Sequence, residues 1–288
     1  MNSWFFAPLI RFGVTKLNIV DTRSHQFAWF LKKTNLRIFC PARLQDGTKI
    51  ISLLGEKISD EIRYNGVYEP ETVKVVSHFL KPGMTFVDVG AHIGQYTILA
   101  SKAVGPGGRV LSIEADPENF SILQRNILLS SLCNVTAMNI AISDTTGSTE
   151  LYLGDASNVG TNSLAIPFNS SGRSITVQTK TLDDVLKVQG ITQVNLVKAD
   201  IEGAEALLLK GGGSILESLN SPVWIMEMNG SQLDKQGSSI AEVVGILEKS
   251  GYSLYNIESK DKYTPEIDDP DFLNIVAVPK RIGIESVL

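Results

Sequence analysis

The chain has 288 residues, of which 43% are hydrophobic and 20% charged, and its net charge is −5. This composition is that of a globular protein with a substantial core, and the acidic balance excludes a nucleic-acid-binding protein. Cys40 and Cys133 are too far apart for a disulfide framework or a metal-ligand spacing, and no apolar run is long enough to span a bilayer. The opening MNSWFFAPLI has no basic residue before its apolar stretch, which argues against a secretory signal. We therefore expect a cytoplasmic protein.

The charge is distributed unevenly along the chain. Residues 1–43 contain seven Lys or Arg and one acid, for a net charge of +6, and eight aromatic side chains precede residue 40. We therefore expect an N-terminal arm over 1–45 and a second domain over 46–288. Such an arm could pack on its own domain. It could also pack on a sister subunit, which would give a homo-oligomer. The alternative is peripheral contact with an anionic membrane or a lipid-linked substrate.

Strands and helices are expected to alternate from about residue 68. The patterns predict a helix over 68–80, a buried strand over 84–90, a helix to about 103, a strand over 109–116, a helix from Pro117 and a strand over 134–143. Residues 144–190 differ, with short strands at 148–154 and 174–180 around a Ser/Asn/Gly-rich middle. Thr181 is then expected to cap a helix, with Asp184 three residues on.

The remaining elements define the fold class. We expect a strand over 194–200, a helix ending at the glycines 211–213, a strand over 222–229, a helix over 239–251, and strands over 252–258 and 271–280. Alternation predicts a doubly wound, mostly parallel sheet of seven strands. The last two strands have no helix between them, so they are expected to pair antiparallel or to lie apart. An α/β sheet with an antiparallel last strand is the plan of class I methyltransferases, which are Rossmann-like.

A glycine turn follows the first strand of this sheet. In FVDVGAHIG, Gly90 and Gly94 allow close approach of a ligand to the backbone, but Ala91 replaces one glycine of the dinucleotide fingerprint. Asp88 would repel a pyrophosphate and suits an ammonium group. Glu114 ends the next strand, where an acid can accept hydrogen bonds from both ribose hydroxyls. An amino-acid end and a ribose without phosphate describe S-adenosyl-L-methionine. The alternative is that Asp88 and Glu114 only cap turns and helices.

A second group of acids lies in LVKADIEGAE. Asp200 follows a strand at the edge where open α/β sheets bind ligands, whereas the helix dipole alone explains Glu202 and Glu205. Glu227 is an acid within the apolar strand VWIMEMN, where a carboxyl group needs a partner or a function.

These segments together resemble the FkbM family of S-adenosylmethionine-dependent methyltransferases. The resemblance rests on GVYEPET, FVDVGAHIGQYTILAS, IEADPENF, TLDDVL, LVKADIEGAE and VWIMEMNG, and extends from about Leu53 to Val278. It implies O-methylation of a hydroxyl on a sugar, glycolipid or polysaccharide, or on a secondary metabolite. The cofactor residues that it implies are Glu69, at the amino-acid end, with Asp88, Gly90, Ala91, His92, Gly94, Glu114, Ala115, Asp116, Ala141 and Asp200.

Methyl transfer to a hydroxyl needs orientation and a base. We expect Asp200 to be that base, with Glu227 or His92 as alternatives, and Glu202 and Asn229 near the acceptor. No metal is expected. The alternative is a divalent ion held by Asp200 with Glu202 or Glu205, orienting vicinal hydroxyls.

Residues 144–190 are the candidate acceptor lid, through Asn158, Thr161, Asn162 and Ser163, although exposed loops commonly have this composition. The acceptor is expected to be a small molecule or a lipid-linked glycan. Other readings are a secondary-metabolite or peptide acceptor, and a cofactor-binding scaffold without catalysis. A nicotinamide oxidoreductase is disfavoured because the third glycine is missing.

Overall fold

A computed structural model describes residues 38–154, 162–164, 173–265 and 273–288. Residues 1–37 of the expected arm, and Asn158 and Thr161 of the expected lid, lie outside these ranges. The compact unit extends over Phe39–Leu288. It begins with strand β1 (Phe39–Arg43), which pairs antiparallel with β2 (Lys49–Leu53). Residues 39–45, which we expected to belong to the arm, are therefore part of this unit. Within the described residues, no helix is long and apolar enough to cross a membrane.

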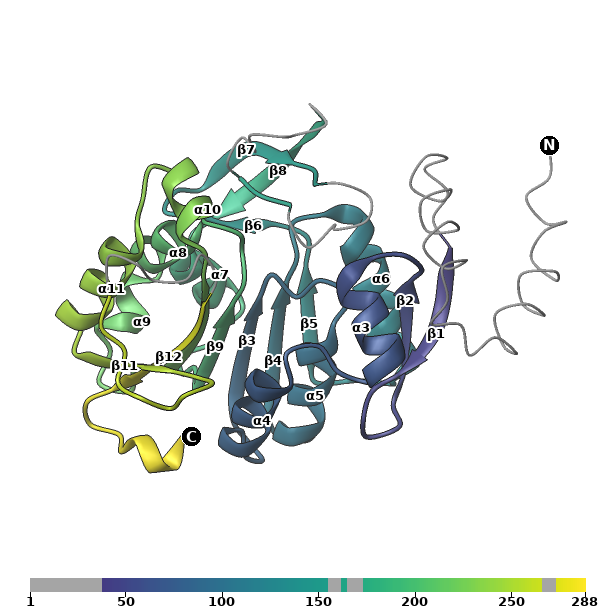
Figure 1. Cartoon of the computed structure of the whole chain (residues 1–288), viewed down its shortest axis with the longest axis horizontal. Coiled ribbons are helices and arrows are strands. Elements are labelled where there is room, and N and C mark those ends of the chain that lie inside the picture. The colour runs from purple at the N-terminus through teal and green to yellow at the C-terminus, as the bar shows by residue number, and fades with distance from the viewer. Residues whose placement is uncertain (1–37, 155–161, 165–172, 266–272) are drawn as a thin grey trace, which may run out of the picture. The chain divides into compact units, whose positions relative to one another are not determined.

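A seven-stranded sheet forms the centre of this unit (Figure 1). Its order is β11-β12-β10-β9-β3-β4-β5, with a crossover at β3, and β12 runs antiparallel to both neighbours while the other pairs are parallel. The strands are β3 (Thr85–Val89), β4 (Arg109–Ile113), β5 (Val135–Met138), β9 (Leu196–Ala199), β10 (Val223–Met228), β11 (Tyr252–Asn256) and β12 (Leu273–Pro279). The expected sheet, with its antiparallel last strand, is confirmed.

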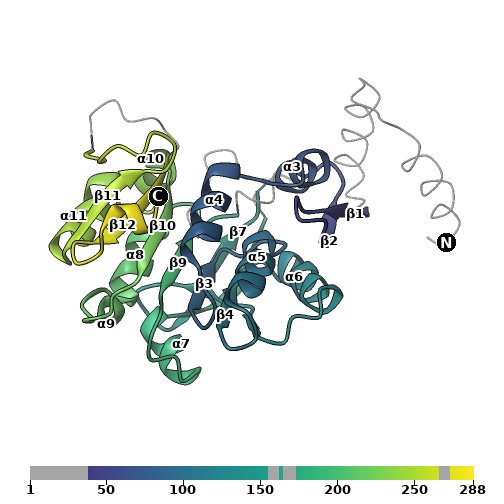
Figure 2. The same cartoon turned by 90° about the horizontal axis from the view of Figure 1, so that it is seen from below.

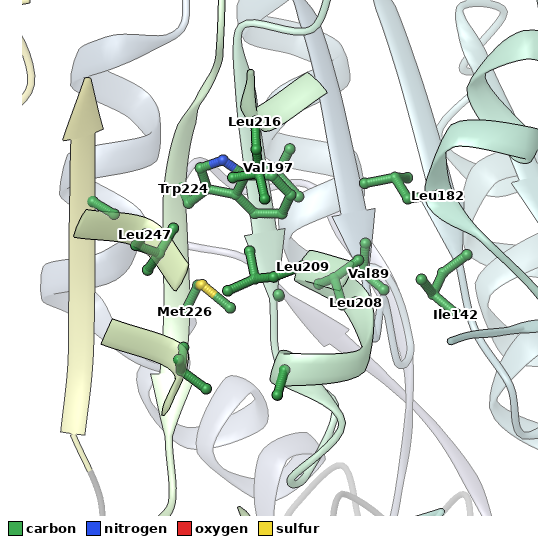
Figure 3. Packing of buried hydrophobic residues seen from close by; sticks show 14 of the residues in the cluster. Val89, Ile142, Leu182, Val197, Leu208, Leu209, Leu216, Trp224, Met226 and Leu247 are labelled. Carbon is green, nitrogen blue, oxygen red and sulfur yellow. The ribbon is translucent and has the colours of Figure 1, made fainter. Parts of the chain in front are cut away.

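Helices cover both faces of this sheet (Figure 2). On one face, α4 (Pro70–Phe79) and α5 (Gln95–Val104) pack over side chains such as Phe86 and Ile225. The other face is covered by α7 (Leu182–Val188), α8 (Glu205–Gly211), α9 (Gly213–Leu216), α10 (Gly230–Lys235) and α11 (Ile240–Lys249). Figure 3 shows Trp224, Met226 and Val197 of this second face packed against Leu209, Leu216 and Leu247. Alternate residues of each strand thus face opposite helical layers, as period two requires.

The β1–β2 hairpin and α3 (Lys57–Asn65) form a separate layer against α6 (Pro117–Leu129). Asn126 of α6 is fully buried, and its side chain accepts a hydrogen bond from Ile51 N at 2.6 Å and donates to Ile51 O at 3.0 Å and Ile93 O at 2.8 Å. One side chain therefore connects the hairpin to the turn that follows β3. A short 3-10 helix, η3 (Ile284–Ser286), closes the chain.

The expected strand over 134–143 is divided in two. β5 belongs to the large sheet, whereas β6 (Ala141–Ile142) pairs with β8 (Ser174–Lys180), which pairs antiparallel with β7 (Gly147–Tyr152). The break lies at Asn139, whose side-chain amide donates to the carbonyl oxygens of Glu114 and Ala115 and so braces the end of β4. The two strands expected in 144–190 and the Thr181 cap of α7 are confirmed, with Thr181 Oγ1 accepting from Asp184 N at 3.1 Å.

Candidate active site

A cavity of about 270 Å³ opens at the carboxyl ends of β3, β4, β9 and β10. This is the edge at which open α/β sheets bind ligands. The small sheet forms one wall, through Ala141, Ile142 and Leu151. The predicted site residues that line the cavity are Gly90, His92, Glu114, Ala115, Ala141, Asn162, Asp200, Glu202, Glu227 and Asn229. Residues from the cofactor turn, the second acidic segment and the insertion therefore meet at one place.

The glycine turn is held by close backbone packing. Gly90 has φ +81°, and a Cβ there would lie 1.9 Å from the carbonyl oxygen of Asp200. At Gly94, with φ +96°, a Cβ would lie 2.7 Å from Leu123 Cδ1. Both positions require glycine for its left-handed backbone and its missing side chain. Gly94 caps α5, and Ala91 is buried with its N–H on Ile113 O at 3.0 Å, so both support the turn rather than line the cavity.

Asp88 is placed differently from the expectation. It is buried beneath the turn, its Oδ2 accepts from Thr97 Oγ1 at 2.7 Å, and it is not among the described residues that line the cavity. Strand alternation points Asp88 under α5, toward the layer that contains Thr97. Burial raises the pKa of Asp88 to about 6. Direct contact between this carboxylate and a ligand ammonium is therefore not supported by the geometry.

Glu114 lies where the ribose acid is expected. Its Oε2 accepts from His92 N and its Oε1 from Asp116 N, each at 2.8 Å, so the carboxylate braces the glycine turn and lines the cavity. Burial raises the pKa of Glu114 to about 8 despite these two backbone donors. Each oxygen retains acceptor capacity for a ligand hydroxyl. Asp116 caps α6 through Glu118 N and is buried behind the cavity.

Asp200, Glu202 and Glu227 form an acidic cluster at the floor of the cavity. One carboxylate oxygen from each lies within 4.8 Å of the other two, so the Asp200 and Glu227 carboxyl groups are close neighbours. Burial raises the pKa of Glu227, and the neighbouring Asp200 charge adds to this rise, so Glu227 holds the proton of the pair. Burial acts in the same direction on Asp200, but the Lys198 ammonium, 3.0 Å from Asp200 Oδ2, keeps its pKa below the ordinary value. Asp200 is thus an ionised carboxylate beside a neutral carboxyl group.

The segment after Asp200 has an unusual backbone. Glu202 has φ +51°, as do Glu69 and His92, and three of the five described non-glycine residues with positive φ thus cluster at this site. Such conformations are disfavoured and are commonly retained at functional sites. Burial raises the pKa of Glu202 to about 8 and that of Glu205 to about 7. Glu205 is turned away from the cavity and its Oε1 accepts from Ile201 N and Gly203 N.

Glu69 belongs to a partly buried hydrogen-bond network beside the cavity. Its carboxylate accepts from Tyr96 Oη at 2.7 Å and from Asn274 Nδ2 at 2.8 Å. The adjacent Tyr68 lines the cavity, and its backbone N–H and C=O are bonded to the Gln95 side chain. The structure therefore presents Tyr68 to a ligand and keeps Glu69 one layer behind it.

His92 and the substrate candidates differ in how they are held. Both ring nitrogens of His92 are buried and have no hydrogen-bond partner among the described residues. Asn162 lines the cavity and donates to Asp116 Oδ2 at 2.7 Å. Ser163 is buried and donates to Glu202 O at 2.7 Å, so it braces the acidic segment rather than lining the cavity. Asn229 lines the cavity and caps α10 through Gln232 N.

Sequence reasoning missed Lys57, Tyr68 and Gln232, which line the cavity, and Lys198, which is buried beneath it. Lys198 is a charged residue within the apolar strand VNLVKAD, just as Glu227 is within VWIMEMN, so the sequence pattern could have identified it as a candidate. Lys57 and Tyr68 belong to segments that precede the sheet in the chain, and no local sequence pattern predicts that these segments lie beside the cavity.

The strand order with one antiparallel strand, and the acid-lined cavity beside a glycine turn, define a class I methyltransferase. Residues 88–254 match the methyltransferase FkbM domain, and the chain belongs to this family. It is similar to Methyltransferase 1 of Beauveria bassiana, with 26% identity over 63% of this chain and 76% of the relative. It is also similar to Methyltransferase sdnD of Sordaria araneosa, with 26% identity over 54% and 70%.

The solved structures to which the chain is similar are more distant. An S-adenosylmethionine-dependent O-methyltransferase from Thermotoga maritima has 13% identity and a TM-score of 0.42, covering 85% of this chain and 79% of its own. A precorrin-6y C5,15-methyltransferase from Geobacter metallireducens has 14% identity and a TM-score of 0.41, covering 73% and 86%. The assignment to the family rests on the domain match and on the topology rather than on these likenesses.

The cofactor of the family is S-adenosyl-L-methionine, and the cavity fits it. Glu114 offers free acceptor capacity for ribose hydroxyls, and Ala141 and Ile142 give an apolar wall beside it for a base. The backbone of Gly90 lines the cavity and allows close approach of a ligand, and the ionised Asp200 carboxylate suits a positively charged ligand.

Proposed function

We propose that this chain transfers a methyl group to a hydroxyl of a sugar, glycolipid or polysaccharide, with Asp200 as the general base. The observation that supports the proposal is an ionised Asp200 that lines the same cavity as Gly90 and Glu114. S-adenosyl-L-methionine, when bound, supplies an electrophilic methyl group on a sulfonium. The residues of this chain have to bind and orient the acceptor and take up its proton.

Asp200 suits the proton-accepting role because its neighbours divide the charge of the cluster. Glu227, whose pKa is raised by burial and by the Asp200 charge, holds a proton, while Lys198 balances the charge of Asp200. A hydroxyl group beside Asp200 can therefore donate to a carboxylate that is ionised at neutral pH. A positioned base of this kind contributes about 10²–10⁴-fold to a rate.

The cavity wall beside this base supports a polyhydroxylated acceptor. Asn162, Asn229 and Gln232 present amide groups, which can both donate and accept hydrogen bonds, and Leu151 and Leu164 give an apolar surface. A sugar ring has hydroxyl groups at its rim and an apolar face, and this lining matches both. A secondary-metabolite hydroxyl or a peptide group is the second candidate acceptor, supported by the same apolar surface.

The test has two stages. The full chain is incubated with S-adenosylmethionine and panels of glycosides, glycolipids, polyketide alcohols and peptides, and S-adenosylhomocysteine formation is measured with the mass of each product. We expect methylated products among the sugars. Products only among the other panels would replace the proposed acceptor, and binding of cofactor without any product would indicate a scaffold.

The role of Asp200 is then tested by Asp200→Asn with the acceptor that was found. We expect turnover to fall by about 10²–10⁴-fold with S-adenosylhomocysteine affinity retained, and Asp261→Asn, on the exposed surface, to behave as wild type. Full turnover in Asp200→Asn would transfer the role to Glu227 or His92, which Glu227→Gln and His92→Asn would then distinguish. Wild-type turnover is expected to be insensitive to EDTA, and inhibition that a divalent ion reverses would contradict that expectation.

A further inference from the structure

One lysine is buried beneath the proposed base. Lys198 of β9 is 3% exposed, and its Nζ donates to Asp200 Oδ2 at 3.0 Å. The other ion pairs between described residues join more exposed side chains: Arg63–Asp60, Lys74–Glu71, Lys102–Asp46 and Lys210–Glu242. A buried ammonium loses its hydration, so its retention in an apolar strand requires compensation by its neighbours.

The position of Lys198 is fixed from several sides. In the parallel register it lies opposite Asp88 of β3 and Ile225 of β10, so it shares the face that α4 and α5 cover. Its Nζ lies 4.6 Å from the centroid of the Tyr96 ring, a cation–π geometry. The Tyr96 hydroxyl in turn donates a hydrogen bond to the Glu69 carboxylate, and this bond fixes the position of the ring. The ammonium is therefore held between an aromatic face and the Asp200 carboxylate.

The groups that act on Asp200 come from every element around it. They are Lys198 from β9, Glu227 from β10, Asp88 and His92 from β3 and its turn, Glu202 and Glu205 from the segment that leads into α8, Tyr96 from α5, and Tyr68 before α4. Four of these eight groups are carboxyl groups, and an ionised carboxylate beside Asp200 would oppose the negative charge of Asp200. Within the described residues, Lys198 is the ammonium that contacts Asp200.

We propose that Lys198 is a positioning residue that acts through Asp200, holding its carboxylate ionised and in place at the floor of the cavity. Lys198 is not among the described cavity-lining residues, so it does not act by touching a ligand. The inference deepens the proposed function, because Asp200 is the base proposed there. Without the ammonium, the charge on Asp200 would lose its buried ion-pair partner while four carboxyl groups remain around it, and the proton of the pair would no longer be confined to Glu227.

The experiment follows the ionisation of Asp200 by carboxyl-carbon NMR of the full chain saturated with S-adenosylhomocysteine, and needs no acceptor. The Asp200 signal is identified by its loss in Asp200→Asn. In Lys198→Met we expect its titration midpoint to move to higher pH, and in Lys198→Arg to return toward wild type. Lys210→Met is the matched control, because it removes a surface ion pair with Glu242 and should leave the Asp200 midpoint unmoved. An unmoved midpoint in folded Lys198→Met would overturn the proposal.

A second measurement keeps the proposal testable if Lys198→Met does not fold. Asp200→Asn is nearly isosteric, and by linkage the loss of its charge must act on Lys198. Side-chain nitrogen NMR should therefore show Lys198 losing its proton at lower pH in Asp200→Asn than in wild type. An unchanged Lys198 titration would reject the coupling. Both measurements are independent of methyl transfer, so a failed acceptor screen rejects the proposed function alone, and failed titrations reject the role of Lys198 alone.

Discussion

Replacing Gly90 with alanine should damage both the fold and the site, because two separate costs arise at this residue. Its backbone has φ +81°, and the added Cβ would lie 1.9 Å from the Asp200 carbonyl oxygen and 2.9 Å from its carbonyl carbon. The left-handed backbone costs an L-residue about 1–2 kcal/mol. Forcing a methyl group into packed structure costs about 1–3 kcal/mol more. We therefore expect Gly90→Ala to lower the free energy of unfolding by about 2–5 kcal/mol.

Gly83→Ala separates these two costs. Gly83 has φ +87°, close to the value at Gly90, but no atom lies within 4 Å of the position that an alanine Cβ would take. This variant should therefore lose about 1–2 kcal/mol from the backbone alone. At roughly 2–4 °C per kcal/mol for a domain of this size, thermal unfolding distinguishes the two variants. The clash also displaces the backbone of Asp200, so only Gly90→Ala should weaken S-adenosylhomocysteine binding in calorimetry.

The two alanine variants would refute this reasoning if they had equal melting temperatures and equal ligand affinities. That result would mean that the segment after β9 moves away from Gly90 without cost. It would also mean that the position of Asp200 does not depend on the glycine turn, which removes the stated reason for glycine at residue 90.

Two further predictions concern stability. Burial raises the pKa of Asp88 to about 6, of Glu205 to about 7 and of Glu114 and Glu202 to about 8, above ordinary values of 3.8 for Asp and 4.5 for Glu. The folded protein then binds more protons than the unfolded chain between about pH 4.5 and 8, so these groups make stability fall as pH rises. The cofactor-free protein should melt lower at about pH 8.5 than at about pH 6, with a smaller difference in Glu114→Gln, and a higher melting temperature at alkaline pH would contradict this. Asn126→Ala removes the three hydrogen bonds of a buried side chain and should lower the free energy of unfolding in urea by about 2–4 kcal/mol. Gln124→Ala, exposed on the same helix, should cost little. Equal losses in the two variants would show that Asn126 does not connect the hairpin to the turn after β3.

Local chemistry made much of the fold readable from the sequence. The Thr181 cap, Pro117 at the start of α6 and the alternation of strands with helices depend on neighbours in the chain, and the structure has each of them. The antiparallel pairing of the last two strands also followed, because a parallel return needs a long crossover, usually a helix, and the sequence has no helix pattern between them. Asn139 was not recognised as a break, since its side chain bonds to carbonyl groups of another strand end.

The chemistry of the site was only partly local. Sequence alone indicated that Gly90, Glu114 and Asp200 end strands of one parallel sheet, whose carboxyl ends must meet at one edge. Alternation along a strand predicts that neighbouring side chains face opposite sides of the sheet, but it does not predict which of the two sides contacts the ligand. Tertiary structure therefore decided that Asp88 lies under α5 while Asp200 reaches the cavity. It also decided that Lys198 lies between Asp200 and Tyr96, because register and helix packing bring together groups that are distant in the chain.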